Sequence, residues 1–356
     1  MRAIQGRARF LVSAGVLVLV LLLVASCHGG YYGQAVLGQT RLLAKREPIV
    51  RVLADPSTPG PLRARLELVQ EIRDFATTQL SLPDNKSYRS FVALEEGQPV
   101  SWTVVAAEEF STTPRTWCFP IAGCVAYRGY FSRRRAEAFA ESLAVEGLDV
   151  AVGGVAAYST LGWFADPVLS SFLERSDADL AGLLFHELSH QVIYVKDDTT
   201  FNESFATFVE LEGVRRWLAA TDREGESASF LEVREHDDQF VELVLETRAE
   251  LDALYAQALD PGEMRRGKVD RFRKLSASYR AARETWGGDS RYDGWFDQEL
   301  GNAHVATVGA YNALVPEFRR VFEASGNDFS EFFRRLENPD LVARLQAASR
   351  DRGATP

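Results

Sequence analysis

The sequence predicts an α+β fold that is mainly α, with a small β-sheet and a helical C-terminal half. Short apolar runs typical of strands are confined to the first half of the chain, at 88–94, 100–105 and 149–155. From Leu180 onward almost every segment has helical periodicity, including a long charged stretch over 229–259. Strands gathered in one part of a chain and helices in another are typical of α+β domains.

The other elements follow from the position of breakers and apolar residues along the chain. A Pro- and Gly-rich breaker at 55–61 separates two helical patterns, Gly147 ends an amphipathic pattern, and Pro261-Gly262 interrupts the charged stretch. The further elements expected are helices at 34–54, 61–80 and 133–146, and a strand at 156–164 joined through glycines to the strand before it.

The composition is that of a globular protein with an acidic surface. Of the 356 residues 46% are apolar, which is enough to bury the core of one or two domains. Lys and Arg total 40 against 50 Asp and Glu, a net charge of −10 that argues against nucleic acid as the main partner. Because 34–349 contains no clear linker, we expect one domain there, followed by a frayed tail at 350–356.

The first 26 residues predict a signal peptide. A basic start precedes an acid-free apolar run over 10–25, and small residues lie at the expected cut. The sequence Val-Ala-Ser-Cys27 resembles the lipobox of bacterial lipoproteins, in which the cysteine becomes the lipidated first residue. We therefore expect a signal peptide at 1–26 and a lipidated tether at 27–33. The alternative, a single membrane-spanning anchor, is disfavoured because the apolar run is shorter than the roughly 20 residues that it needs.

The lipobox resemblance also implies a location. His28 rather than Asp follows Cys27. By the sorting rule of such lipoproteins, the chain would be lipid-anchored on the periplasmic side of the bacterial envelope, with the outer membrane favoured. The membrane is then a partner through the Cys27 lipid.

Two further cysteines, Cys118 and Cys124, flank a short segment that contains Pro and Gly. In an oxidising compartment this arrangement favours a disulfide that holds a loop. Half of a zinc site is the alternative, which is disfavoured because no second Cys or His pair lies nearby.

The segment that carries chemistry is His186-Glu187-Leu-Ser-His190, preceded by an apolar helical pattern and a possible cap at Ser176. Two His four residues apart project from one helix face, so both imidazoles can reach one metal ion. Glu187 projects about 100° around the helix from His186, where it can act on water without being a ligand. This is the H-E-x-x-H pattern of zinc hydrolases. The alternative is a helix made only for packing, which would bury these polar groups at a cost in desolvation.

A third zinc ligand is predicted at Glu203, because a catalytic zinc keeps three protein ligands and an open position. The sequence Asn202-Glu203-Ser-Phe-Ala resembles the glutamate-supplying helix of gluzincins, the thermolysin-like metallopeptidases. If the first helix ends near Val195, a tight hairpin brings Glu203 level with His190. In the alternative, Glu203 only caps its own helix together with Thr200, and Asp197 or Asp198 is the ligand. We expect one Zn²⁺ per chain.

Several longer sequence blocks accompany these motifs. They are Leu82-Pro83 with Ser87-Tyr88, Trp102, Trp117-Cys118-Phe119-Pro120, Tyr127-Arg128-Gly129-Tyr130-Phe131, and Tyr158 to Phe164 with Asp166-Pro167. Together with the two motifs they resemble the predicted-aminopeptidase family of bacterial lipoproteins, from about residue 30 to about residue 330. The resemblance implies a zincin-like catalytic domain and a zinc metallopeptidase that hydrolyses peptides.

The roles that follow can be assigned to residues. Zinc would lower the pKa of a bound water toward about 7, and Glu187 would act as the general base. The second oxyanion donor is predicted to be Tyr311, which belongs to a stretch that resembles a family block with Asn302 and Ala303. His304 and Tyr194 are the alternatives for this donor, whereas His236 is expected on a solvated face.

Substrate-binding residues are less constrained by the sequence. Zincins bind peptides along a sheet edge, and the stretch from Tyr158 to Phe164, with Gly162 permitting close backbone approach, is the candidate edge strand. An aminopeptidase also needs an anion for the free amine of its substrate. The candidates are Glu108, Glu109, Asp166 and Glu210, of which Glu210 could instead support the metal ligands.

The sequence thus predicts a lipid-anchored zinc peptidase, an aminopeptidase by the family resemblance. One alternative is a non-catalytic, zinc-stabilised envelope lipoprotein that acts as an assembly or binding factor. Another is a zinc hydrolase that acts on cell-wall fragments. The presence of Glu187 favours catalysis over a binding role.

Overall fold

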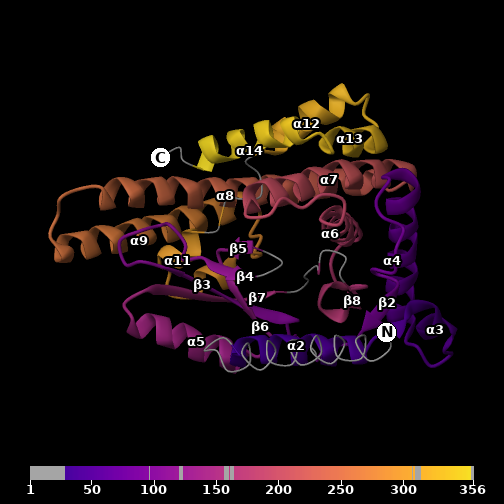
Figure 1. The fold of residues 1–356 in the computed structure, drawn as a ribbon, viewed down its shortest axis with the longest axis horizontal. Helices are drawn as coiled ribbons and strands as arrows, with labels where there is room; N and C mark the ends of the chain where they lie inside the picture. Colours follow the sequence, from indigo (N-terminus) through magenta and orange to yellow (C-terminus); the bar gives the residue numbers. More distant parts are fainter. Residues whose placement is uncertain are drawn as a thin grey trace, which may run out of the picture.

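The computed structural model describes residues 29–95, 97–119, 123–155, 160, 164–306, 308 and 314–353. Helices make up most of this part of the chain, and its strands form two three-stranded sheets and one two-stranded sheet (Figure 1). The predicted class, α+β and mainly α with a helical C-terminal half, is confirmed. None of the helices described is both long enough and apolar enough to cross a membrane.

The N-terminal part differs from the prediction in two respects. The helix expected over 34–54 is two helices, α2 (Gly29–Ala44) and α3 (Ile49–Ala54), divided at Pro48, which is the N-cap of α3. Gly29 to Gly33, which fall within the expected tether, are helical and belong to α2. The Tyr31 ring packs 5.6 Å from Phe119 and 5.5 Å from Tyr130, so α2 is part of the folded domain.

Two small sheets lie in the first half of the chain. In the first, β2 (Ser90–Val92) pairs with β1 (Glu47–Pro48) and runs parallel to β8 (Val168–Leu169). In the second, β3 (Ser101–Ala107) lies between β6 (Arg128–Tyr130) and β7 (Asp149–Val155), with both pairings antiparallel. The helix α5 (Arg133–Val145) packs on this sheet, and Gly147 takes a positive φ of 89° just after it, as the predicted helix end requires.

A disulfide hairpin forms the third sheet. The strands β4 (Trp117–Phe119) and β5 (Gly123–Val125) are antiparallel, and Cys118 lies directly opposite Cys124. The two cysteines are bonded, which confirms the predicted disulfide.

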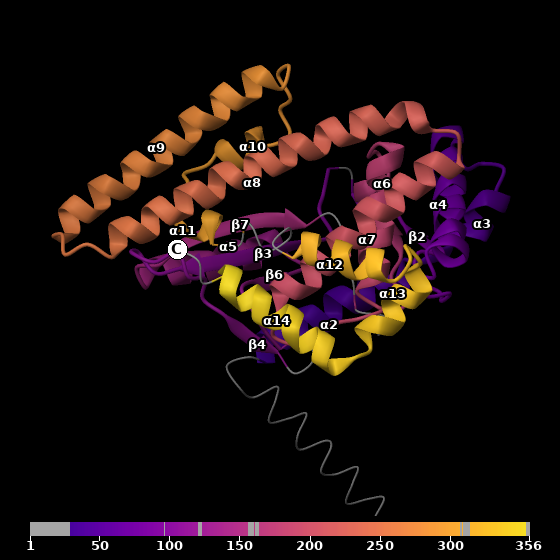
Figure 2. The ribbon, with the colours of Figure 1, turned by 90° about the horizontal axis from the view of Figure 1, so that it is seen from above.

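The rest of the described chain is nearly all helical. Its helices are α4 (Gly60–Gln79), α6 (Asp177–Ser189), α7 (Thr199–Ala220), α8 (Ser227–Tyr255), α9 (Pro261–Thr285), α10 (Asp293–Phe296), α11 (Asn302–Val305), α12 (Val315–Ala324), α13 (Phe329–Leu336) and α14 (Pro339–Gly353), with short 3₁₀ turns at Ser170–Phe172 and Glu224–Glu226. Pro261 begins α9, where Asp260 caps the first turn, and α14 reaches into the tail that was expected to fray. Figure 2 shows α8 and α9 as a long arm beside the body of the molecule.

The largest core holds α6 and α7 in place. It lies between α4, α6, α7 and the layer of α12 to α14, and it is rich in Phe. Phe185 of α6 and Phe201, Phe205 and Phe208 of α7 are fully buried. Because such closely packed interiors resist deformation, the two helices form a rigid support for side chains at their facing ends.

Candidate metal centre

The helix α6 presents the H-E-x-x-H residues because its other face is buried. Ser176 caps the helix as predicted, with its Oγ accepting the N–H of Asp179 at 3.1 Å. Leu184 and Leu188 are fully buried in the main core. The helix ends at Ser189, earlier than the predicted end near Val195, and His190 is its C-cap.

The connection from α6 to α7 is closed by Asn202. This side chain accepts the N–H of Val195 at 2.7 Å and donates to the carbonyl of the same residue at 2.7 Å. Asp198 caps α7 by accepting the N–H of Phe201 at 2.9 Å, so the alternative in which Glu203 only caps this helix together with Thr200 does not hold. The carboxylate of Glu203 is thereby left to face α6.

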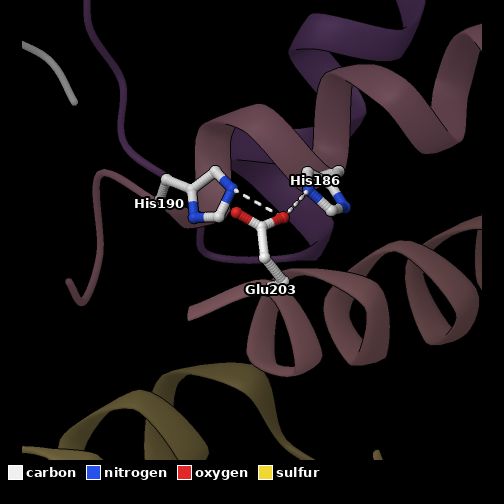
Figure 3. A group of neighbouring side chains, drawn as sticks. All are labelled: His186, His190 and Glu203. Carbon is white, nitrogen blue, oxygen red and sulfur yellow. Dashed lines mark ion pairs between the residues drawn. The ribbon is translucent and has the colours of Figure 1, made fainter. Parts of the chain in front are cut away.

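Three predicted ligands come together between the two helices (Figure 3). The Oε2 atom of Glu203 lies 3.3 Å from Nε2 of His186 and 3.9 Å from Nε2 of His190. One donor atom from each residue lies within 4.8 Å of the others. A tetrahedral zinc with bonds of about 2.0 to 2.2 Å separates its ligand atoms by roughly 3.3 to 3.6 Å. The donor types and their spacing therefore fit zinc after small side-chain adjustments.

The other candidates for a third ligand are engaged elsewhere. Asp197 accepts the backbone N–H of Cys124 at 2.7 Å, and Asp198 caps α7. Neither belongs to the cluster of possible metal ligands within the described residues. The bond to Cys124 instead docks the disulfide hairpin on the α6–α7 connection.

Gly123 permits this docking. Its φ is +76°, and a Cβ atom there would lie 2.2 Å from Oδ1 of Asp197. The close approach of hairpin and connection thus depends on the absence of a side chain.

A second carboxylate orients one of the histidines. Oε2 of Glu210 lies 3.1 Å from Nδ1 of His186, and its other oxygen pairs with Arg234. Bonding at Nδ1 leaves Nε2 of His186 to face Glu203, as a metal ligand requires. Gly182 makes room for this carboxylate, because a Cβ there would lie 3.1 Å from Glu210 Oε1. Both oxygens of Glu210 are thus engaged, one with the candidate ligand His186 and one with Arg234.

The electrostatics of the site follow from burial among several carboxylates. Burial raises the pKa of Glu187 to about 7. The neighbouring His186 acts to lower this pKa, whereas the charge of Glu203 raises it further. Burial alone would lower the pKa of His186, but hydrogen bonds to Glu203 and Glu210 outweigh it and raise the pKa to about 10. Burial and the neighbouring His186 lower the pKa of His190 to about 4. A carboxyl with a pKa near neutrality can both take and release a proton at that pH.

Tyr127 is electrostatically coupled to the candidate metal centre, although the sequence analysis gave it no role. Tyr127 lies two residues after β5, the second strand of the disulfide hairpin, and its side chain is 45% exposed. Its pKa is raised to about 12 because the surrounding protein desolvates the phenolate, and Glu203, Tyr194 and Glu187 disfavour it further. Glu203 and Glu187 are thus near enough to Tyr127 to raise its pKa. The one signal in the sequence is its place in the block Tyr127-Arg128-Gly129-Tyr130-Phe131.

Several predicted residues lie outside the described part of the chain. These are Cys27, Tyr158, Gly162 and Tyr311. Leu314, which follows the Tyr311 segment, donates its N–H to Oγ of Ser204 at 3.2 Å, next in sequence to Glu203.

The two other histidines in the described part of the chain, His236 and His304, have structural partners. His304 is buried in α11, where its Nδ1 accepts the N–H of Gly301 at 3.0 Å. The prediction of a solvated His236 is wrong. This ring is 8% exposed, stacks on Trp286 at 4.9 Å and has its Nδ1 3.0 Å from Asp289.

Two other candidates for an amine anchor also have partners. Glu109 pairs with Arg265 at 2.6 Å. Asp166 is 2% exposed and accepts bonds from the N–H and hydroxyl of Thr160 at 3.0 and 2.7 Å. The structure singles out no residue as the amine anchor.

Comparisons with known proteins give one match. A family model described as "Putative aminopeptidase" matches residues 30–352, nearly the whole described chain. No curated protein matches the sequence. No solved structure matches it either.

Proposed function

The chain belongs to the putative aminopeptidase family, and on that basis we propose that it is a zinc-dependent peptidase, specifically an aminopeptidase. One Zn²⁺ would be held by His186, His190 and Glu203. The observation that carries the proposal is the convergence of these three side chains next to Glu187. A domain that used zinc only for stability would need no carboxylate at that position.

The chemistry divides between the metal and the chain. When bound, zinc would lower the pKa of water and polarise the scissile carbonyl. Glu187 takes the proton of the attacking water and delivers it to the leaving amine. Burial raises the pKa of this carboxyl above its ordinary value, which favours uptake of that proton.

A second donor to the developing oxyanion is proposed at Tyr311. The bond from Leu314 to Ser204 supports this role, because it ties the end of the Tyr311 segment to the turn of α7 that carries Glu203. Tyr127 and Tyr194 are the other phenols of the region, and the pKa of each is raised in part by Glu203. We propose the stretch with Tyr158 and Gly162 as the edge on which an extended peptide lies, since it continues from the edge strand β7.

We also propose that a lipid on Cys27 anchors the protein on the periplasmic side of the bacterial envelope, with the outer membrane favoured. The packing of Tyr31 in α2 against Phe119 and Tyr130 supports an anchor close to the domain. Mass spectrometry of the N-terminal peptide from wild type and Cys27→Ser tests this. An unlipidated Cys27 in the protein from its native envelope would refute it.

The decisive experiment is hydrolysis of a peptide library by the protein with and without zinc. We expect release of N-terminal residues that is abolished by a chelator and restored by zinc. Cleavage only within peptides would refute the aminopeptidase assignment. Zinc binding without any hydrolysis of peptides would refute the peptidase, and hydrolysis of cell-wall fragments by the same protein would then identify the substrate.

A further inference from the structure

A chain of paired charges runs from the metal centre into the helical arm. It begins at His186, whose Nδ1 lies 3.1 Å from Oε2 of Glu210. Oε1 of the same carboxylate pairs with Nη2 of Arg234 on α8. Nη1 of Arg234 lies 3.5 Å from Oδ2 of Asp237, one turn further along α8. Three helices are thus joined by side chains of alternating charge.

The far end of this chain is anchored by the loop that follows α9. Oδ1 of Asp237 accepts bonds from Nη1 of Arg291 at 3.1 Å and from the hydroxyl of Tyr292 at 2.6 Å. Arg291 also pairs with Asp289 at 2.8 Å, and Asp289 meets His236 at 3.0 Å. Arg234 is therefore fixed from both sides.

The interaction between Glu210 and Arg234 fixes the orientation of the carboxylate because Glu210 is buried. Glu210 is 8% exposed, and its two oxygens are divided between His186 and Arg234. The guanidinium of Arg234 also lies 5.1 Å from the Phe230 ring, which leaves it little freedom to move. A buried carboxylate held by a planar guanidinium has a fixed orientation, whereas one without that partner can rotate.

We propose that Arg234 is a positioning residue for the metal centre, acting through Glu210 to hold the His186 ring with Nε2 toward the metal. Asp237, held by Arg291 and Tyr292, in turn fixes Arg234. The affinity for zinc therefore depends on α8 and on the loop after α9, although neither contributes a ligand. This inference rests on the proposed function, because it presupposes that His186 binds zinc.

The test is the zinc dissociation constant of the whole protein, measured by competition with a chelating dye. We expect Arg234→Met to raise the dissociation constant about 10- to 100-fold, the range found when residues that support metal ligands are changed. Arg234→Lys keeps the charge without the planar fork, and we expect an intermediate loss. The matched control is Arg248→Met on the same helix, since Arg248 is also partly buried but bonds Thr112 at 3.3 Å.

A double-mutant cycle separates positioning from a general structural role. If Arg234 acts through Glu210, the variant Arg234→Met/Glu210→Gln binds zinc no more weakly than Glu210→Gln alone. If the two substitutions act independently, their fold-changes in the zinc dissociation constant multiply, and that result would overturn the inference. An unchanged dissociation constant in Arg234→Met would also overturn it.

The same measurements distinguish a failure of this inference from a failure of the proposed function. A wild-type protein that binds no zinc overturns both proposals, whereas zinc binding that is insensitive to Arg234 overturns this one alone. If Arg234→Met does not fold, Asp237→Asn provides the measurement, because it loosens Arg234 without removing a buried cation. Its zinc affinity should fall, and an affinity equal to that of wild type would contradict the inference.

Discussion

The side chain of Asn202 bonds both the N–H and the carbonyl of Val195, each at 2.7 Å. Val195 lies in the connection between α6 and α7, and Asn202 is the residue before Glu203. The pair therefore sets how closely the start of α7 approaches the end of α6. That approach decides whether Glu203 can meet His186 and His190.

Replacing Asn202 should open this connection. Asn202 is 2% exposed, so Asn202→Ala removes two buried hydrogen bonds and takes from the N–H of Val195 the oxygen that accepts it. We expect a loss of about 1–3 kcal/mol in the free energy of unfolding and weaker zinc binding. Urea unfolding checks the first effect, with Gln79→Ala at the exposed end of α4 as control, which should change stability by about 0.5 kcal/mol or less. Wild-type stability in Asn202→Ala would contradict the role of this pair.

Removal of Glu203 should remove the metal. Because its carboxylate supplies the third donor, Glu203→Ala should bind much less zinc, whereas Asp197→Asn and Asp198→Asn should keep about one zinc per chain. Elemental mass spectrometry of these three variants and of the wild type checks this. One zinc retained in Glu203→Ala would mean that a different residue completes the site.

Changing Glu187 should separate binding from chemistry. Glu187→Gln keeps the size of the side chain and loses the base, so zinc content should be unchanged while peptide hydrolysis falls by at least about 10²- to 10⁴-fold. The exposed Glu174→Gln serves as control and should hydrolyse peptides like the wild type. Activity that survives in Glu187→Gln would exclude this residue as the general base.

These residues also show what could be predicted from the sequence. The spacing of His186 and His190 is local, because helical periodicity alone places both on one face. The disulfide was predictable because Cys118 and Cys124 are close in sequence and share a turn. The class of the fold followed from where apolar alternation gives way to helical periodicity.

Residues fixed by distant parts of the chain could not be predicted. The residues on both sides of His236 are charged, which predicted that its ring is exposed to solvent. Its partner Asp289 lies 53 residues away and could not be foreseen from them. Arg234 supports Glu210 across 24 residues, a separation that no helical repeat encodes. The end of α6 at Ser189 was missed because helical periodicity continues beyond it, whereas Asn202 holds the following backbone out of the helix.

The disulfide should stabilise the hairpin without being needed for metal binding. It closes a loop with a sequence separation of 6, for which chain entropy predicts about 2 kcal/mol of stabilisation. We therefore expect Cys118→Ser/Cys124→Ser to lower the free energy of unfolding by that amount, as measured by urea denaturation without reductant. The wild type in reductant should match the variant. A variant as stable as the oxidised wild type would show that the hairpin is held by its other contacts alone.

The docking of the hairpin on the metal centre should depend on Gly123. At φ +76° a Cβ atom is strained, and here it would also lie 2.2 Å from Oδ1 of Asp197, which accepts the N–H of Cys124. Gly123→Ala should therefore push the hairpin away from the α6–α7 connection and displace Tyr127, which follows it. We expect a loss of about 1–3 kcal/mol in stability, together with a lower kcat/KM for peptides at unchanged zinc content.

Gly129→Ala is the matched control for that change, because a Cβ at Gly129 meets no atom within 4 Å. It should resemble the wild type in urea unfolding and in peptide hydrolysis. If Gly123→Ala is equally harmless, the hairpin does not contribute to the site. If Gly123→Ala loses zinc as well as activity, the hairpin holds the α6–α7 connection itself in place, because Asp197 is the residue through which it acts.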